Sequence, residues 1–174
     1  EGPSELILVD LGRGRNRLGG SILAQVHGQF GESVPDLDDP AEFKRFFGCV
    51  QQLAADKLVL AYHDRSDGGL FVTVCEMAFA GRCGVNINLD MFAYDAQAHD
   101  VDGNERRPNV MYGRDQDRVL AALFAEELGA VLQVRAKDRG AVLMRLREAG
   151  LQALLIGAPN EGGEIRLIRN AKAI

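Results

Sequence analysis

The chain has 174 residues, a length that suits one domain with its own hydrophobic core. Hydrophobic residues make up 47% of it and charged residues 26%, which is typical of a globular protein. A net charge of −5 argues against nucleic acid as the main partner. No apolar run approaches the roughly 20 residues of a membrane span, and no secretory signal is evident, so we expect a cytoplasmic protein that does not contact membranes.

Strands and helices alternate along the chain, with apolar residues at helical or strand spacing. The expected strands are residues 5–10, 58–62, 83–89, 130–135, 154–157 and 164–168. The expected helices are residues 21–29, 40–56, 70–80, 116–128 and 138–149. Residues 90–114 have no apolar period and are predicted to form a long loop insertion. Because the last two strands are joined by a hairpin-like connection at 159–163, the pattern favours an α/β fold with a mixed sheet over a purely parallel one.

A helix start, the phenylalanines that follow it and the cysteines each predict a local feature. Asp39 and Pro40 mark a helix start, and the phenylalanine stripe that follows is expected to pack in the core or at a domain interface. The cysteines, Cys49, Cys75 and Cys83, have no C-x-x-C spacing, which predicts reduced thiols without zinc or a disulfide framework.

The most informative segment is HDRSDGGL at residues 63–70. An apolar run precedes it and a helical pattern follows, so a strand ends, acids and a hydroxyl are presented, and two glycines lead into a helix. Glycines at a helix N-terminus let a ligand approach free backbone N–H groups, where the helix dipole favours negative charge. Carboxylates beside a phosphate need a cation between them, and hard oxygen ligands suit Mg²⁺. The segment therefore suggests a metal-bridged phosphate site, and an acidic capping turn with tightly packed glycines is equally compatible.

The sequence also contains residues of two other site types, a hydrolytic triad and a glycine-rich phosphate-binding loop. His63, Asp64 and Ser66 include the residue types of a hydrolytic triad, but neighbours in sequence cannot readily form that relay, and we expect His63 to be packed and hydrogen-bonded. The glycine-rich stretch before residue 22 fits neither a dinucleotide fingerprint nor a Walker A loop. Gly20 and Ser21 remain candidates for phosphate binding, with arginines upstream; a basic loop with Ser21 as helix N-cap is the favoured interpretation.

Three strings carry a family resemblance: AYHDRSDGGL at 61–70, EMAFAGRCGV at 76–85 and LAALFAEELGAVLQVRA at 120–136. In this order they resemble the large, single-chain phosphoribosylformylglycinamidine synthase. The chain is similar to the second C-terminal-type domain of its synthetase core, a fold shared with aminoimidazole ribonucleotide synthetase. The likeness runs to about Gly157 and is interrupted near 90–114. It implies a three-layer α/β/α arrangement.

The resemblance also implies roles for single residues. Asp64 matches a magnesium ligand, Ser66 matches a contact with ATP, and Gly68 and Gly69 would keep the backbone open near the phosphates. No residue is implied to be catalytic.

A pair of acids in the third string departs from the family pattern. Glu126 and Glu127 stand where the family usually has FNEELG, and Ala125 replaces the asparagine. An acidic edge at the C-terminal end of a helix, held by packing, explains the pair at least as well as a functional role does.

The implied activity is that of an ATP- and Mg²⁺-dependent ligase of purine synthesis. It activates the formyl-amide oxygen of formylglycinamide ribonucleotide, and ammonia from glutamine displaces the phosphorylated oxygen. Because the chain begins Glu1-Gly2-Pro3 and has no counterpart of the glutaminase, we expect residues 1–174 to be one domain of a longer chain and inactive alone. Its partners would be the barrel-type synthetase domains and the glutaminase domain. Two alternatives stay open: a domain that holds a purely structural nucleotide, and a domain of aminoimidazole ribonucleotide synthetase.

Overall fold

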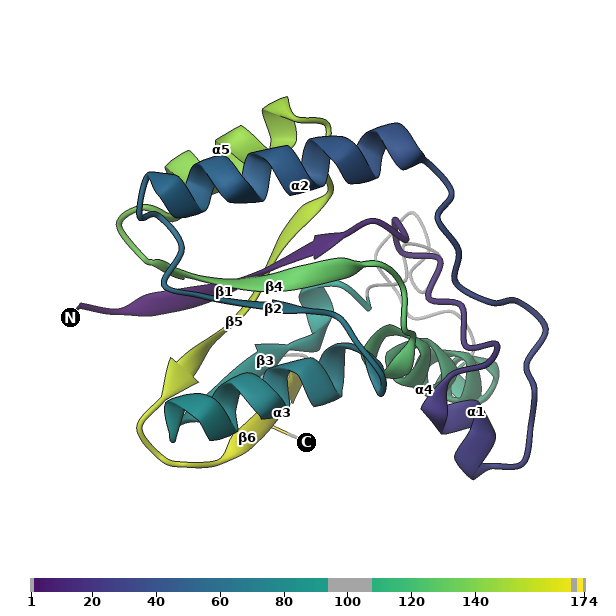
Figure 1. Cartoon of the computed structure of the whole chain (residues 1–174). Coiled ribbons are helices and arrows are strands. Elements are labelled where there is room, and N and C mark those ends of the chain that lie inside the picture. Colours follow the sequence, from purple (N-terminus) through teal and green to yellow (C-terminus); the bar gives the residue numbers. More distant parts are fainter. Residues whose placement is uncertain (1, 94–107, 170–171, 174) are drawn as a thin grey trace.

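The computed structural model of the chain describes residues 2–93, 108–169 and 172–173, and only the backbone at 108–115. Seven strands form one sheet between two pairs of helices (Figure 1). The strands are β1 (Ser4–Asp10), β2 (Ala61–Asp64), β3 (Gly84–Asn88), β4 (Gly129–Arg135), β5 (Ala153–Asn160), β6 (Ile165–Arg169) and β7 (Lys172–Ala173). The helices are α1 (Ile22–Val26), α2 (Pro40–Ala55), α3 (Gly69–Gly81), a short 3₁₀ helix (Leu89–Met91), α4 (Pro108–Phe124) and α5 (Arg139–Glu148).

The sheet is mixed, in the order β2-β4-β1-β5-β3-β6-β7, with β3 and β6 parallel and the other pairs antiparallel. The mixed sheet that the sequence predicts is confirmed, but the predicted hairpin between the last two long strands is wrong. β3 lies between β5 and β6, and both hold it: Asn160 Nδ2 donates to Asn86 Oδ1 at 2.9 Å, and Val85 N donates to Glu164 O at 3.0 Å. The connection 161–164 therefore carries the chain past the start of β3.

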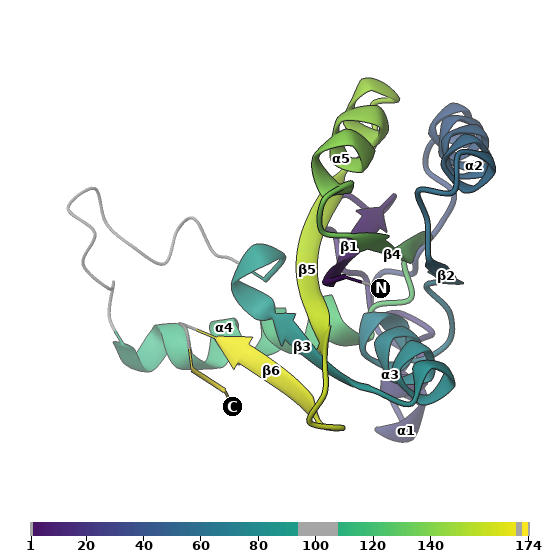
Figure 2. The ribbon, with the colours of Figure 1, turned by 90° about the vertical axis from the view of Figure 1, so that its left-hand side faces the viewer.

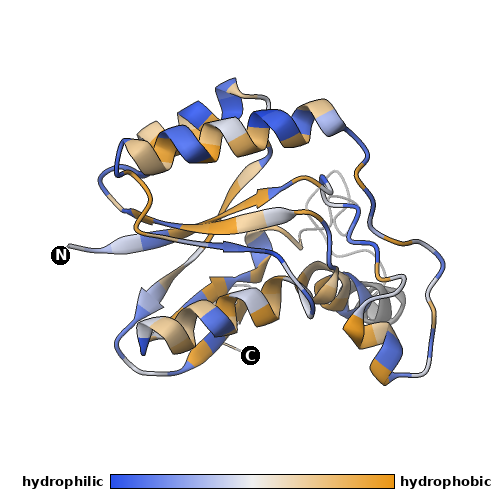
Figure 3. Ribbon diagram, in the orientation of Figure 1, coloured by the Kyte–Doolittle hydropathy of each residue, from blue (hydrophilic) through white to orange (hydrophobic). Residues whose placement is uncertain are grey.

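Helices cover both faces of the sheet, which confirms the three-layer α/β/α arrangement. α2 and α5 lie on one face and α3 and α4 on the other, as the two perpendicular views show (Figures 1 and 2). In β1, Ile7 and Val9 pack into the core beneath α2 and α5, whereas Leu6 and Leu8 pack into the core on the α3 side. Because both faces of β1 are buried in its second half, Leu6–Val9 form an unbroken apolar run, which belongs to the hydrophobic, orange part of the sheet in Figure 3.

Helix α2 begins as the sequence predicts. Pro40 is its first residue, and the Asp39 side chain caps it by accepting a hydrogen bond from Ala41 N at 2.8 Å. Of the phenylalanine stripe, only Phe46 is in the core; Phe43 is 40% exposed and Phe47 61% exposed. The stripe therefore supplies one core residue and leaves two rings on the surface.

The predicted loop at 90–114 is wrong at its C-terminal end, because α4 already begins at Pro108. A proline favours the first position of a helix as well as a loop, and the residues that follow have no apolar repeat to distinguish the two. Residues 94–107 of the predicted loop lie outside the described residues. The helix also ends at Phe124 instead of 128, so Glu126 and Glu127 lie in the connection to β4 and not on a helix.

Candidate functional site

The turn between β2 and α3 carries the residues that the sequence singles out. The preceding strand runs from Ala61 to Asp64 and pairs with β4, so the predicted strand at 58–62 lies too early. Leu58 lies instead just after the turn that ends α2, where its N–H donates to Leu53 O at 3.0 Å, and it packs against the α2 side of the core. Asp64 is consequently the last residue of a paired strand, and α3 begins five residues later.

The outer side of this turn presents oxygen groups. Asp64 and Asp67 are exposed, and Ser66 is half-buried. Within the described residues, the carboxylates of Asp64 and Asp67 and the hydroxyl of Ser66 have no hydrogen-bond or ion-pair partner. These groups are available to solvent or to a ligand.

The inner side of the turn is anchored by Arg65, whose side chain is only 1% exposed. Its Nη2 lies 2.7 Å from Asp10 Oδ1 and 3.2 Å from Leu128 O, and its Nε donates to Glu127 O at 2.6 Å. A buried guanidinium is tolerable only when paired and hydrogen-bonded, and these contacts satisfy that condition. Arg65 therefore holds the turn against the ends of β1 and the start of β4.

Asp10 extends this anchor to the loop after β1. Its Oδ1 accepts from Gly12 N at 3.0 Å and its Oδ2 from Gly14 N at 2.7 Å, in addition to the ion pair with Arg65. Neither Asp10 nor Arg65 was predicted from the sequence to belong to the site. An available signal was the charge of Asp10 directly after the apolar run Leu6–Val9, because buried carboxylates need a cation.

The two glycines of the turn have left-handed backbone conformations, with φ of +82° at Gly68 and +70° at Gly69. Gly68 N donates to Glu126 Oε1 at 2.8 Å, and Gly69 N donates to Ser66 O at 2.9 Å. A Cβ on Gly69 would lie 2.7 Å from the carbonyl carbon of Phe124, so this glycine allows α3 to approach the end of α4. Both amides already have acceptors, and a phosphate-binding role for these glycines stays a prediction.

The loop before α1 has the contacts of a capped helix. The Ser21 side chain accepts from Ala24 N at 3.2 Å and donates to Leu18 O at 2.7 Å, while Gly20 N donates to Phe30 O at 2.8 Å. This confirms Ser21 as N-cap, and phosphate binding at Gly20 and Ser21 stays a prediction. The helix that it caps has only five residues and ends at Val26, three residues before its predicted end.

The upstream arginines are paired with carboxylates. Arg13 lies 2.7 Å from Glu42, and Arg15 lies 2.5 Å from Asp38. Arg17 donates from Nε and Nη2 to the two Glu127 oxygens at 2.8 and 2.7 Å, a bidentate arrangement. The basic loop is therefore neutralised by the protein itself.

Glu127 is a buried carboxylate at the centre of this network, only 1% exposed. Burial alone would raise the pKa of Glu127, but the hydrogen bonds and charge of Arg17 outweigh burial and hold the pKa below its ordinary value. The pKa of Asp38 is also lowered, chiefly by hydrogen bonds from Arg17 and Arg15. Both carboxylates therefore favour the folded state when they are ionised.

The lowered pKa of Glu127 predicts acid sensitivity. Since Glu127 binds its proton more weakly in the folded protein than in the unfolded chain, its contribution to stability is complete above about pH 4.5 and is lost as pH falls through the folded pKa. The urea midpoint of unfolding, measured between about pH 3 and 6, should fall toward acid. Glu127→Gln should flatten this dependence, whereas Glu161→Gln, at an exposed position, should leave the slope unchanged. A slope unaffected by Glu127→Gln would contradict this assignment.

His63 is packed and hydrogen-bonded, as the sequence predicts. Its Nδ1 lies 2.7 Å from Asp64 O, and its Nε2 lies 3.1 Å from the carboxylate of Glu76 on α3. The ring thus joins the end of β2 to α3, and no contact with the hydroxyl of Ser66 is formed. The imidazole supports the turn and is not arranged as the base of a triad.

A resident metal centre is not found among the described residues, where no group of three or more His, Cys, Asp or Glu side chains could hold an ion. Magnesium is commonly bound by one or two carboxylates together with substrate phosphates. Asp64 and Asp67 fit this second mode. The three cysteines are free, and burial raises the pKa of Cys49 and Cys75.

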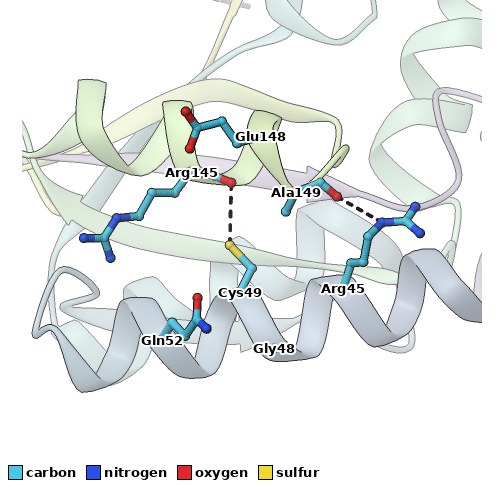
Figure 4. A pocket seen from close by; sticks show the side chains of 7 residues that line it. All are labelled: Arg45, Gly48, Cys49, Gln52, Arg145, Glu148 and Ala149. Carbon is cyan, nitrogen blue, oxygen red and sulfur yellow. Dashed lines mark hydrogen bonds between the residues drawn. The ribbon is translucent and has the colours of Figure 1, made fainter.

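A hollow lies between α2 and α5, the two helices on the opposite face of the sheet from α3, and Figure 4 shows the residues that line it. The two arginines that line it are already engaged: Arg45 Nε donates to Ala149 O at 3.0 Å, and Arg145 pairs with Asp56. Cys49 Sγ lies 3.9 Å from Arg145 O. Of the charged side chains that line this hollow, only the exposed Glu148 has no hydrogen-bond or ion-pair partner among the described residues. None of the helices in the described ranges is sufficiently long and apolar to span a bilayer.

Comparison with solved structures finds the same fold in larger proteins. PurL of Thermotoga maritima complexed with ATP matches the whole chain with a TM-score of 0.68 and 16% identity, and the match covers 24% of that protein. PurL of the same organism complexed with FGAR matches with a TM-score of 0.67 and 15% identity, and the match covers 27% of that protein. Escherichia coli HypE, a hydrogenase maturation protein, matches with a TM-score of 0.60 and 23% identity, and the match covers 49% of that protein. The chain thus spans about a quarter of the length of PurL and half that of HypE.

The family is shown by the sequence itself. The model of the family described as AIR synthase related protein, C-terminal domain, matches residues 4–170, which include every long element of the sheet and all five α-helices. This agrees with the layers, the mixed sheet and the structural likenesses. The chain belongs to the family of AIR synthase related C-terminal domains.

Proposed function

We propose that this chain is a domain of a phosphoribosylformylglycinamidine synthase, an ATP-dependent carbon–nitrogen ligase with glutamine as amide donor. The three matching strings, the family membership and the likeness to PurL structures with ATP and FGAR support this proposal. The observation that carries it is the β2–α3 turn, where Asp64 and Ser66 are free on the outer side and Arg65 is anchored on the inner side.

In this proposal the turn contributes a nucleotide–magnesium site. Asp64 would hold Mg²⁺ on its exposed carboxylate, with Asp67 close by in sequence, and the Ser66 hydroxyl would donate to the nucleotide. When bound, the cation would neutralise phosphate charge, which the acidic turn could not approach otherwise. Because Arg65 fixes the backbone from behind, little reorganisation is needed when the ligand arrives.

The rest of the activity would come from the remaining domains of the complete protein. Barrel-type synthetase domains would complete the nucleotide and substrate sites, and a glutaminase domain would supply ammonia, all in the cytoplasm. Because the remaining domains would supply the rest of these sites and the ammonia, the domain alone is expected to be inactive. The same turn serves either a catalytic nucleotide or a structural one, and mutation separates these cases.

In the complete protein, Asp64→Asn keeps the side-chain shape but removes a full charge, and it is expected to weaken Mg²⁺-dependent binding of AMPPCP about tenfold or more. Ser66→Ala should weaken binding about 2- to 12-fold, the equivalent of one neutral hydrogen bond of about 0.5–1.5 kcal/mol. Calorimetric titration measures both effects. Asp117→Asn, at an exposed position on α4, is the control and should bind like the wild type.

A catalytic and a structural nucleotide site differ in how Asp64→Asn changes turnover, Tm and the nucleotide content of the purified protein. At a catalytic site, Asp64→Asn lowers turnover of formylglycinamide ribonucleotide, ATP and glutamine, while the Tm without ligand barely moves. At a structural site, nucleotide disappears from the purified protein and the Tm falls. Unchanged nucleotide content, Tm and turnover in both variants would refute the assignment and leave a glycine-capped turn.

A further inference from the structure

A single carboxylate oxygen joins two helix N-termini beside the proposed site. Glu126 Oε1 accepts a hydrogen bond from Gly68 N at 2.8 Å and another from Ile22 N at 2.9 Å. The three residues are far apart in sequence, with separations of 58 and 104 positions from Glu126. Gly68 is the N-cap of α3, and Ile22 is the first residue of α1.

This contact supplies what α3 lacks locally. Helix N-termini leave N–H groups unsatisfied, and a nearby side chain usually accepts from them. The N-cap of α3 is a glycine, which has no side chain to cap the first turn, and the N–H of Gly68 itself finds its acceptor in Glu126, elsewhere in the fold. A carboxylate is favoured at this position because the helix dipole is positive there. Glu126 therefore takes the place at the start of α3 where an anionic ligand would otherwise be attracted.

Glu126 is itself held in a fixed place. The neighbouring Glu127 is buried and bound by Arg17, and its carbonyl oxygen accepts from Arg65. Two anchors thus converge on the turn from one connection between α4 and β4. Arg65 fixes its first half, and the Glu126 carboxylate fixes its second half at Gly68.

We infer that Glu126 is a positioning residue for the nucleotide turn. It acts by accepting from Gly68 and Ile22, so that the backbone carrying Asp64 and Ser66 and the start of α1 are set together. The inference rests on the proposed nucleotide function of the turn. It assigns a role to a residue that the sequence placed on an acidic helix edge.

Two substitutions distinguish loss of the Glu126 hydrogen bonds from loss of its negative charge. In Glu126→Gln the amide oxygen can still accept from both N–H groups, although the charge is gone. In Glu126→Ala both N–H groups lose their acceptor. Glu126→Asp is shorter by one methylene and is the second variant if the alanine protein does not fold, because it should not reach both donors. Glu161→Ala, at an exposed position, is the matched control.

The first measurement needs no ligand. Hydrogen–deuterium exchange of the complete protein, well below the Tm of every variant, should show faster exchange in both segments 20–30 and 64–72 for Glu126→Ala or Glu126→Asp. Glu126→Gln and Glu161→Ala should exchange like the wild type, and segment 129–135 should be unchanged in all. Exchange altered in only one segment, or equally fast exchange in Glu126→Gln, would overturn the inference.

The second measurement uses AMPPCP with Mg²⁺ at the same temperature. Binding should weaken about tenfold or more in Glu126→Ala and stay within about threefold of the wild type in Glu126→Gln. A merely structural role would lower the Tm of Glu126→Ala and leave its affinity unchanged, which would also overturn the inference. If the wild type itself binds no nucleotide while both segments respond, the proposed function fails and the positioning of the turn by Glu126 is upheld.

Discussion

Replacing Arg65 by methionine is expected to destabilise the domain by about 3–5 kcal/mol, because it leaves the Asp10 carboxylate buried without its cation. The carbonyl oxygens of Glu127 and Leu128 lose their donor at the same time. Urea unfolding with a constant m-value measures the change. Arg139→Met is the control: its pairing with Glu5 is 45% exposed on the arginine side, and its loss should cost less than about 1 kcal/mol.

A double-mutant cycle distinguishes the ion pair from simple loss of packing. Asp10→Asn removes the charge that makes Arg65→Met costly, so the two substitutions together should cost less than the sum of the single ones. Arg65→Lys keeps the charge but cannot reproduce the fork of donors, and an intermediate loss is expected. Additive effects of the two single substitutions would show that the pair does not anchor the turn.

Gly69→Ala is expected to cost about 2–5 kcal/mol, since two penalties act at one position. The left-handed backbone, φ +70°, disfavours a Cβ by roughly 1–2 kcal/mol. The new Cβ would also lie 2.7 Å from the backbone of Phe124 and 2.8 Å from Ala125 O, and such overpacking costs about 1–3 kcal/mol. Because α3 and the end of α4 would have to separate, nucleotide binding by the complete protein should weaken as well.

Gly14→Ala is the control that measures the cost of the left-handed backbone alone. Gly14 has φ +74° and no atom within 4 Å of a Cβ, so only the conformational cost applies. The difference in unfolding free energy between the two variants then reports the close approach of α3 to α4. Equal losses would mean that the contact at Gly69 relaxes freely and is not required for the site.

Sequence patterns predicted those features whose signal lies in adjacent residues. The cap of α2 by Asp39 and Pro40 depends on adjacent residues, and the burial of β1 follows from an unbroken apolar run. The position of β6 could not be predicted in this way. Its partner is decided by which strand edge is free after β5 and β3 have paired, a property of the assembled sheet.

The same distinction applies to the site. The segment that holds Asp64 and Ser66 was singled out as a candidate site because it has a strand before it and glycines after it, all within ten residues, and the family resemblance implied the roles of the two residues. The anchors were missed, since Arg65 looks like one more charge in a polar turn, and its acceptors lie 55 to 63 positions away. Glu126 was assigned to a helix because a short polar stretch after an apolar repeat does not mark where the helix ends.

The sheet order has a consequence for how the chain is made. β1 is synthesised first, yet both of its neighbours, β4 and β5, come from the last third of the described chain. Gly129, the first residue of β4, follows Asp10 by about 120 residues, which takes the ribosome roughly 6 to 24 s. During that time an apolar strand with two buried faces has no partner on either edge. The nascent domain therefore cannot build the centre of its sheet until β4 and β5 have both been synthesised, and β1 has no strand partner until then.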